Sequence, residues 1–195
     1  MADQRLSSYI KCLYDLLLST QVTDSRGMVL PLGEGTSKVV EMILSAKSTS
    51  GKAMVIGNGG SAAIASHLQN DLCKAVGVRV LDFSQVPLLT ALSNDEGYGS
   101  VYERPVELWA DAGDLLVAIS SSGRSENIIR AVQAAAARKC RIITLSGFSS
   151  DNPLRRLGNL NFYVASSEYG YVESAHTVIS HFVIDRAVMS RSEKM

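Results

Sequence analysis

Five short apolar segments, separated by stretches long enough for a helix, constrain the fold of this chain more than any other feature. The segments cover residues 53–57, 78–83, 114–120, 141–147 and 161–166. They are mainly apolar instead of alternating regularly with polar residues, which is typical of parallel strands covered by helices on both faces. The sequence therefore predicts an α/β fold, a three-layer α-β-α sandwich with a five-stranded parallel sheet.

Helical periodicity precedes and follows these segments. Apolar residues recur at steps of three and four near the N-terminus, first at Leu6, Ile10, Leu13, Leu16 and Leu17, then at Val39, Ile43 and Leu44. This spacing predicts two amphipathic helices, with residues 25–35 as the connection between them, and residues 171–190 form a closing helix. At 195 residues the chain fits one domain, 1–195, with a helical extension over about 1–50.

Charge and cysteine usage exclude several classes of partner. Lysine plus arginine and aspartate plus glutamate both number 19, so no net field attracts nucleic acid or an anionic membrane. The widely spaced Cys12, Cys73 and Cys140 match no zinc motif and are expected to be buried thiols of a reducing compartment. Because no signal core or membrane span is recognisable, we expect a cytoplasmic protein.

Two loops that follow predicted strands have an unusual composition. GNGGS, residues 57–61, follows the first strand, and SSSGRS, residues 120–125, follows the third. Glycine permits close backbone approach, and hydroxyls beside a free helix N-terminus form a neutral cradle for phosphate. In a parallel sheet such loops meet at the carboxyl ends of the strands, which predicts a phosphate site there.

Each loop also has a purely structural interpretation, because glycine and serine are common turn and cap residues. Neither loop is a dinucleotide fingerprint, since the glycine spacing is wrong, and the chain has no phosphate-loop lysine. We therefore expect no nucleotide cofactor.

All three histidines lie on predicted helices. His67 and Asp71 are four residues apart and share one helix face, and Glu173 and His181 are eight apart and share another. If the two faces meet, the four side chains can bind a divalent ion or move protons. A surface pair and a satisfied core histidine are the structural alternatives. His176, three residues after Glu173, is expected only to orient that residue.

Taken together, these motifs resemble the SIS-domain sugar-phosphate isomerases, and most closely the phosphoheptose isomerases of surface-polysaccharide synthesis. The resemblance is carried by GNGGS with His67 and Asp71 behind it, SND at 93–95, ISSSGRS at 119–125 and YVESAHTVISH at 171–181. It implies a homotetramer with active sites between subunits. By position, it implies substrate binding by Asn58, Gly59, Gly60, Asn94, Asp95, Ser120, Ser121, Ser122 and Ser125. It implies zinc ligands at His67, Asp71, Glu173 and His181, with Asp71 and His181 as the acid/base pair.

Two positions depart from the family pattern. Asp71 stands where a glutamate is usual, so its carboxylate is one methylene shorter, and Glu173 stands where a glutamine is usual, which adds a second candidate base. The resemblance implies an aldose–ketose isomerase that converts sedoheptulose 7-phosphate to D-glycero-D-manno-heptose 7-phosphate through an enediol. The alternatives are an isomerase of another phosphosugar and a non-catalytic sugar-phosphate-binding module or protein adaptor.

Overall fold

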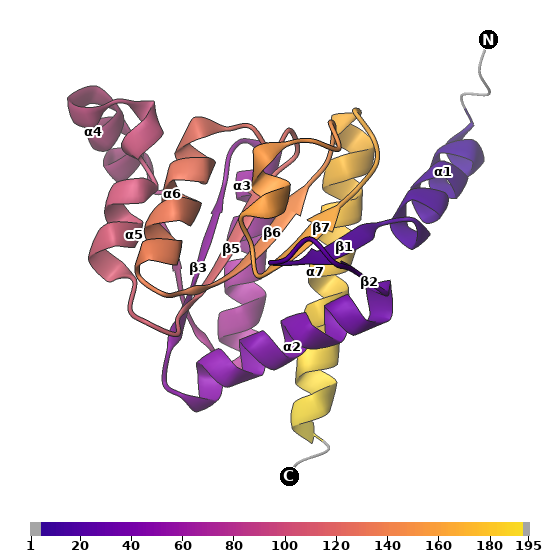
Figure 1. The fold of residues 1–195 in the computed structure, drawn as a ribbon, viewed down its shortest axis with the longest axis horizontal. Helices are drawn as coiled ribbons and strands as arrows, with labels where there is room; N and C mark the ends of the chain where they lie inside the picture. The colour runs from indigo at the N-terminus through magenta and orange to yellow at the C-terminus, as the bar shows by residue number, and fades with distance from the viewer. Residues whose placement is uncertain (1–4, 193–195) are drawn as a thin grey trace.

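The chain forms a three-layer sandwich around a seven-stranded sheet, described over residues 5–192 in a computed structural model (Figure 1). The helices are α1 Leu6–Leu18, α2 Leu32–Ser48, α3 Gly60–Asp71, α4 Val86–Glu96, α5 Glu103–Trp109, α6 Glu126–Ala137 and α7 Tyr169–Ser192. The strands are β1 Gln21–Asp24, β2 Val29–Leu30, β3 Lys52–Gly57, β4 Arg79–Asp82, β5 Leu115–Ser120, β6 Arg141–Ser146 and β7 Leu160–Tyr163. Short helical turns are η1 Leu72–Val76, η2 Tyr98–Ser100 and η3 Pro153–Arg156.

The predicted fold class is confirmed, but the sheet has seven strands instead of the expected five. The order is β2-β1-β7-β6-β5-β3-β4, in which β3 to β7 are parallel and β1 and β2 form an antiparallel hairpin at the β7 edge. Part of this hairpin lies within the segment expected to be a connection. The hairpin turn is fixed by Asp24, whose Oδ1 accepts the backbone N–H groups of Arg26 and Met28 at 2.9 Å each, and by Gly27 at φ +79°.

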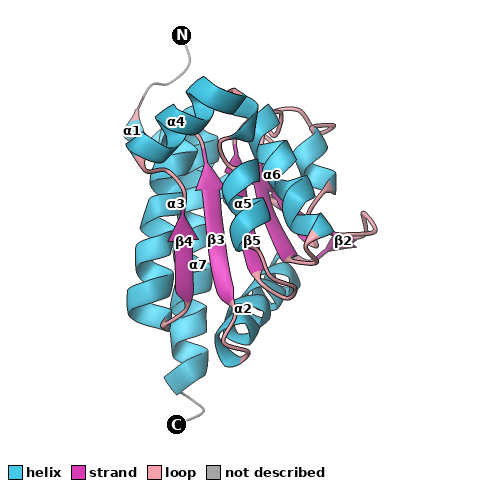
Figure 2. Ribbon diagram, turned by 90° about the vertical axis from the view of Figure 1, so that its left-hand side faces the viewer, coloured by secondary structure: helices cyan, strands magenta, loops and turns pink. Residues whose placement is uncertain are grey.

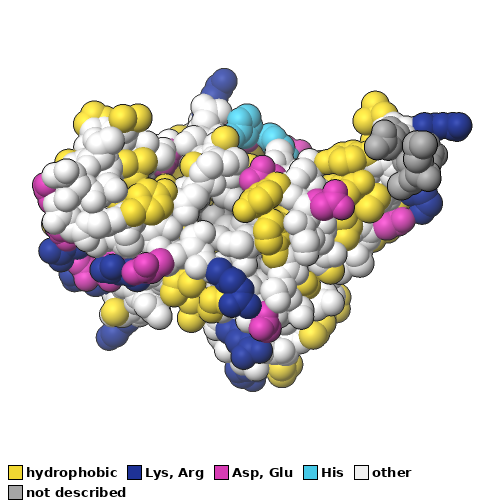
Figure 3. All heavy atoms as spheres, turned by 90° about the horizontal axis from the view of Figure 1, so that it is seen from above, with side chains coloured by type: hydrophobic (Ala, Val, Ile, Leu, Met, Phe, Trp, Pro, Cys, Tyr) yellow, Lys and Arg dark blue, Asp and Glu magenta, His cyan; other side chains and the backbone are white. Residues whose placement is uncertain are grey.

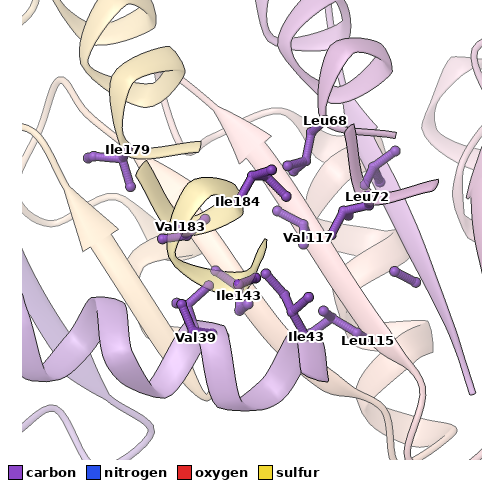
Figure 4. Packing of buried hydrophobic residues seen from close by; sticks show 14 of the residues in the cluster. Val39, Ile43, Leu68, Leu72, Leu115, Val117, Ile143, Ile179, Val183 and Ile184 are labelled. Carbon is purple, nitrogen blue, oxygen red and sulfur yellow. The ribbon is translucent and has the colours of Figure 1, made fainter. Parts of the chain in front are cut away.

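The parallel strands β3, β5, β6 and β7 are buried on both faces, whereas the edge strand β4 buries only Asp82. One face packs against α2, α3 and α7, and Figure 4 shows Ile43 of α2, Leu68 of α3 and Val183 of α7 converging over Val117 of β5. The other face packs against α5 and α6, where Ile128 meets Leu116. Successive residues of one strand therefore enter two different cores, which leaves no polar face on these strands.

The strand order reverses between β3 and β5, and this reversal places the site. From β3 the chain crosses to β4 on one side and then returns to β5 on the other side. Such a point opens a crevice at the carboxyl ends of the two strands. The glycine loop follows β3 and the serine loop follows β5, so both loops border this crevice, and Figure 2 shows α4 above the same end of the sheet.

The cysteine prediction is wrong for two of three residues. Cys140 is buried, which raises the pKa of its thiol to about 11, whereas Cys12 and Cys73 are exposed. Cys12 is exposed because α1 projects from the sandwich and buries none of its residues fully (Figure 1). Cys73 lies in the turn η1 and points to solvent. Among residues 5–192, no helix is both long and apolar enough to cross a bilayer.

Candidate active site

The two loops and the first turns of α7 enclose a pocket of about 240 Å³. Its lining comprises Asn58, Gly59, Gly60, Ser61, Ser120, Ser121, Ser122, Ser125, Tyr169 and Glu173. The structure therefore brings together seven of the nine predicted substrate-binding residues. It adds Glu173, a carboxylate, to the same pocket.

Hydrogen bonds from three neighbouring side chains hold the glycine loop in place. Buried Tyr102 donates its hydroxyl to the carbonyl of Gly57 at 2.5 Å, and burial raises the pKa of Tyr102, so that hydroxyl remains a donor. The amides of Asn58 and Asn127 form two reciprocal hydrogen bonds of 2.9 Å each. Tyr98 donates a third bond of 2.9 Å to Asn58 Oδ1. The Asn58 side chain is thus an anchor of the loop.

The serine loop presents a buried hydroxyl that has no protein partner. The loop turns through Gly123, whose N–H donates to the carbonyl of Ser120 at 3.0 Å, and the carbonyl of Ser121 accepts from Gly147 at 2.9 Å. Ser120 and Ser125 bring their hydroxyls within 3.3 Å of each other. The buried Ser121 hydroxyl has no hydrogen-bond partner within the described part of the chain. Such a group loses free energy unless a ligand satisfies it.

Three of the four predicted metal ligands form one cluster on α3 and α7. Asp71 Oδ2 lies 3.3 Å from Nε2 of His67 and 3.6 Å from Nδ1 of His181. The two imidazole rings meet edge to face, with centroids 4.9 Å apart. All three ligand atoms lie within 4.8 Å of one another, and both imidazoles are about half exposed. Figure 3 shows the exposed histidines side by side at the surface.

Glu173 lies away from this cluster and inside the pocket. Eight residues of helix separate it from His181, a rise of about 12 Å. Its carboxylate contacts Gly60 at the start of α3, where any β-carbon would overlap it. Glycine at position 60 is therefore required by the placement of this carboxylate.

Asn94 and Asp95 are not brought into the pocket. Both are exposed on α4, where Asn94 Nδ2 donates to Asp95 Oδ1 at 2.8 Å. The segment after this helix does reach the site, because Tyr98 bonds to Asn58.

His176 faces the core instead of Glu173. Its Nε2 lies 3.2 Å from the carbonyl of Ser146, to which it donates, and the ring is completely buried. Burial lowers the pKa of His176 to about 4, so the imidazole is neutral at physiological pH. The residue therefore ties α7 to the end of β6.

Sequence reasoning missed Tyr169, which lines the pocket, and Asn127 and Tyr98, which hold its glycine loop. Asn127 left one signal, since it is an amide on the otherwise apolar inner side of a helix that follows the serine loop. Tyr98 and Tyr169 left none, because a lone tyrosine near a helix end has many structural uses.

The sequence matches known proteins along most of its length. Residues 32–147 match the family model described as the SIS domain. The chain is 32% identical over 163 residues to a phosphoheptose isomerase of Citrifermentans bemidjiense, covering 79% of this chain and 83% of that protein. It is 38% identical over 143 residues to a phosphoheptose isomerase of Pelobacter propionicus, covering 69% and 74%.

The fold matches a solved structure from the same group of proteins. The phosphoheptose isomerase of Neisseria gonorrhoeae superposes with a TM-score of 0.80 and 26% identity, covering 96% of this chain and 98% of that one. The likeness therefore extends over the helical N-terminus as well as the sandwich.

Proposed function

Since the chain belongs to the SIS-domain family and is a phosphosugar isomerase, we propose that it converts sedoheptulose 7-phosphate to D-glycero-D-manno-heptose 7-phosphate. The names of its relatives support the seven-carbon substrate. The observation that carries the proposal is the pocket whose lining combines Glu173 with the serine loop, in which the buried Ser121 hydroxyl has no hydrogen-bond partner among residues 5–192.

The serine loop binds the phosphate end of the substrate. Ser121 supplies a hydroxyl without a hydrogen-bond partner in the described residues, and Ser120, Ser122 and Ser125 supply three more around the turn. The loop leads into α6 at Glu126, and the side chain of the N-cap residue Ser125 accepts none of the first backbone N–H groups of that helix. Those N–H groups carry positive potential toward the pocket, which suits a phosphate without a lysine.

Glu173 is the base that moves the proton. Isomerisation requires a base to take a proton from the carbon beside the carbonyl, an acid to protonate the carbonyl oxygen, and return of the proton one carbon along the chain. Glu173 is the carboxylate that lines the serine pocket, whereas Asp71 is engaged between two imidazoles. Of the two candidate bases, the geometry favours Glu173, which lines the pocket.

The cluster of His67, Asp71 and His181 is suited to a divalent ion, and we assign it to zinc. Two imidazoles and one carboxylate are a ligand set that catalytic zinc sites use, with a further position left open. Zinc held there by His67, Asp71 and His181 would supply Lewis-acid polarisation of a bound oxygen. Because these three side chains are enough to hold the ion, Glu173 is not needed as a fourth ligand and is available for proton transfer.

The protein assembles as a homotetramer with active sites completed between subunits. Supporting this, α1 carries an exposed stripe of Leu6, Ile10, Tyr14 and Leu18 at steps of four residues. The neighbouring residues Leu13, Leu16 and Leu17 already pack on the chain's own sandwich. An apolar stripe of this kind on a projecting helix is typical of a contact between copies.

An activity assay with ketose phosphates of five, six and seven carbons, with and without zinc, tests the proposal. We expect turnover to be fastest with sedoheptulose 7-phosphate and the aldoheptose 7-phosphate to appear by NMR. In calorimetry, the double variant Ser121→Ala/Ser125→Ala should bind the sugar phosphate at least roughly tenfold more weakly, because it loses hydrogen bonds to a charged group. Binding without turnover of any sugar would instead favour a sensor module.

A further inference from the structure

A second polar hollow lies beside the β1–β2 hairpin, at the sheet edge visible in Figure 1, and shares no residue with the pocket described above. It has a volume of about 490 Å³ and is lined by three arginines and three hydroxyl residues, Arg26, Arg155, Arg156, Thr23, Ser25 and Ser150. We propose that this arginine hollow is a second anion site, which binds the phosphoryl group of a phosphorylated small molecule.

The hollow carries an excess of positive charge that the protein does not neutralise. Its single acid, Asp24, is already committed to its own hairpin, because Oδ1 accepts two backbone N–H groups and Oδ2 pairs with Arg26 at 3.1 Å. Neither Arg155 nor Arg156 forms an ion pair within the described part of the chain. In a chain whose net charge is zero, two unpaired guanidinium groups in one concavity leave a local positive field.

Arg155 is held in a fixed orientation by groups that leave its charge unbalanced. Its guanidinium carbon lies 4.2 Å from the centroid of the Tyr163 ring, and its terminal nitrogens donate to the Ser150 carbonyl at 2.9 Å and to Gln21 Oε1 at 2.5 Å. All three partners are neutral. A fixed arginine with neutral partners loses little conformational freedom when an anion binds.

The turn η3 that carries Arg155 and Arg156 is itself rigid. Asn152, which is completely buried, caps it by accepting the N–H of Arg155 at 3.1 Å. The same side chain donates to the carbonyls of Gly147 and Ser149 at 3.1 and 2.8 Å. The arginines therefore stand on a pre-organised element, which is the arrangement that a binding site requires.

Phosphate is the anion that this chemistry fits. Guanidinium groups bind phosphate with paired, charge-assisted hydrogen bonds, and hydroxyls such as those of Ser25 and Ser150 can donate to its remaining oxygens. The volume of the hollow lies in the range of small-molecule sites. Its arginines and hydroxyls favour a phosphorylated ligand over an apolar one.

Calorimetric titration of inorganic pyrophosphate into the full-length protein tests this site separately from the serine loop. The Ser121→Ala/Ser125→Ala variant weakens binding at the serine loop, and arginine substitutions on that background report the contribution of the arginine hollow. On that background, exposed Arg156→Glu should weaken pyrophosphate binding by roughly tenfold or more, and Arg26→Ala should weaken it as well. Arg138→Glu, the same charge change at an exposed residue remote in sequence, is the matched control and should leave binding unchanged.

A second site is supported if the Ser121→Ala/Ser125→Ala variant still binds pyrophosphate and if adding Arg156→Glu to that variant weakens the binding while adding Arg138→Glu does not. The proposal is overturned if the serine variant shows no binding, if Arg156→Glu binds as tightly as its parent, or if Arg138→Glu loses as much affinity. Circular dichroism of each variant confirms folding before titration. Failure here leaves the isomerase proposal intact, because that proposal is read from turnover.

Discussion

Gly60 shows how one missing side chain makes room for the carboxylate of Glu173, the proposed base. A β-carbon at this position would overlap the Glu173 carboxylate, so Gly60→Ala must push that carboxylate out of place. A displacement of about 1 Å can lower an enzymatic rate roughly a hundredfold. We expect the variant to lose activity to about this extent while its melting temperature remains close to that of the wild type.

The matched control is Gly33→Ala, because a β-carbon at Gly33 meets open space. It lies in the first turn of α2 and should be neutral or slightly stabilising. Steady-state kinetics of both variants decide the matter. Full activity in Gly60→Ala would show that the position of Glu173 is irrelevant to turnover.

His176 makes stability depend on pH. Its pKa is about 4 in the folded chain, against about 6.5 for an unperturbed histidine. Between these values the unfolded chain binds more protons, so the stabilisation is complete above pH 6.5 and is lost as the pH falls toward 4. The loss is on the order of 3 kcal/mol.

Thermal denaturation from pH 7.5 to 4.5 measures this effect. His176→Asn, which does not titrate, should be less stable at pH 7.5 and should show a flatter decline than the wild type. Parallel declines for the two proteins would assign the acid sensitivity to other groups.

At the scale of elements, we expect the glycine loop and the serine loop to behave as one unit because Asn127 of α6 holds Asn58. Asn127→Ala removes two hydrogen bonds of 2.9 Å to Asn58 and one of 3.0 Å from the N–H of Ile128 at a buried site, and it leaves the Asn58 amide half paired. We expect an unfolding free energy lower by about 1–3 kcal/mol and a raised KM for the sugar phosphate. Tyr98→Phe, which removes a single exposed bond, should have the smaller effect on both quantities. Equal effects would mean that the loops are not coupled through Asn127.

The elements themselves were largely predictable, and the exceptions have physical reasons. The parallel strands were visible because burial on both faces forces a run such as 115–120 to be uniformly apolar. The hairpin was not, because β1 and β2 are only four and two residues long and are held by the Asp24 turn instead of a hydrophobic pattern.

For the site, the sequence predicted contacts within one helix but not the alignment of two helices. The i, i+4 spacing of His67 and Asp71 fixes their contact within one helix. Sequence spacing does not fix how far two helices slide past each other, so the alignment of α3 with α7 was open. That alignment places His181 at the cluster and Glu173 at the pocket.

At the scale of the whole molecule, α1 is expected to join subunits. Light scattering at micromolar concentration should report a mass near four times 20.9 kDa. Ile10→Glu/Tyr14→Glu places charge on the exposed apolar stripe and should dissociate the assembly without unfolding the chain. Lys11→Glu, also exposed on α1, is the control that should preserve it. A monomeric wild type would contradict sites shared between subunits.

Solvent-hydrogen exchange tests the central claim, that Glu173 moves a proton of a sugar phosphate held by the serine loop. Sedoheptulose 7-phosphate is incubated in D2O with wild type or Glu173→Gln, and deuterium beside the carbonyl is followed by NMR. We predict incorporation with the wild type, a rate lower by roughly 10²–10⁴ in Glu173→Gln, and calorimetric affinity for the sugar phosphate that is retained. Exchange by Glu173→Gln at the wild-type rate, or no exchange by the wild type, would contradict it.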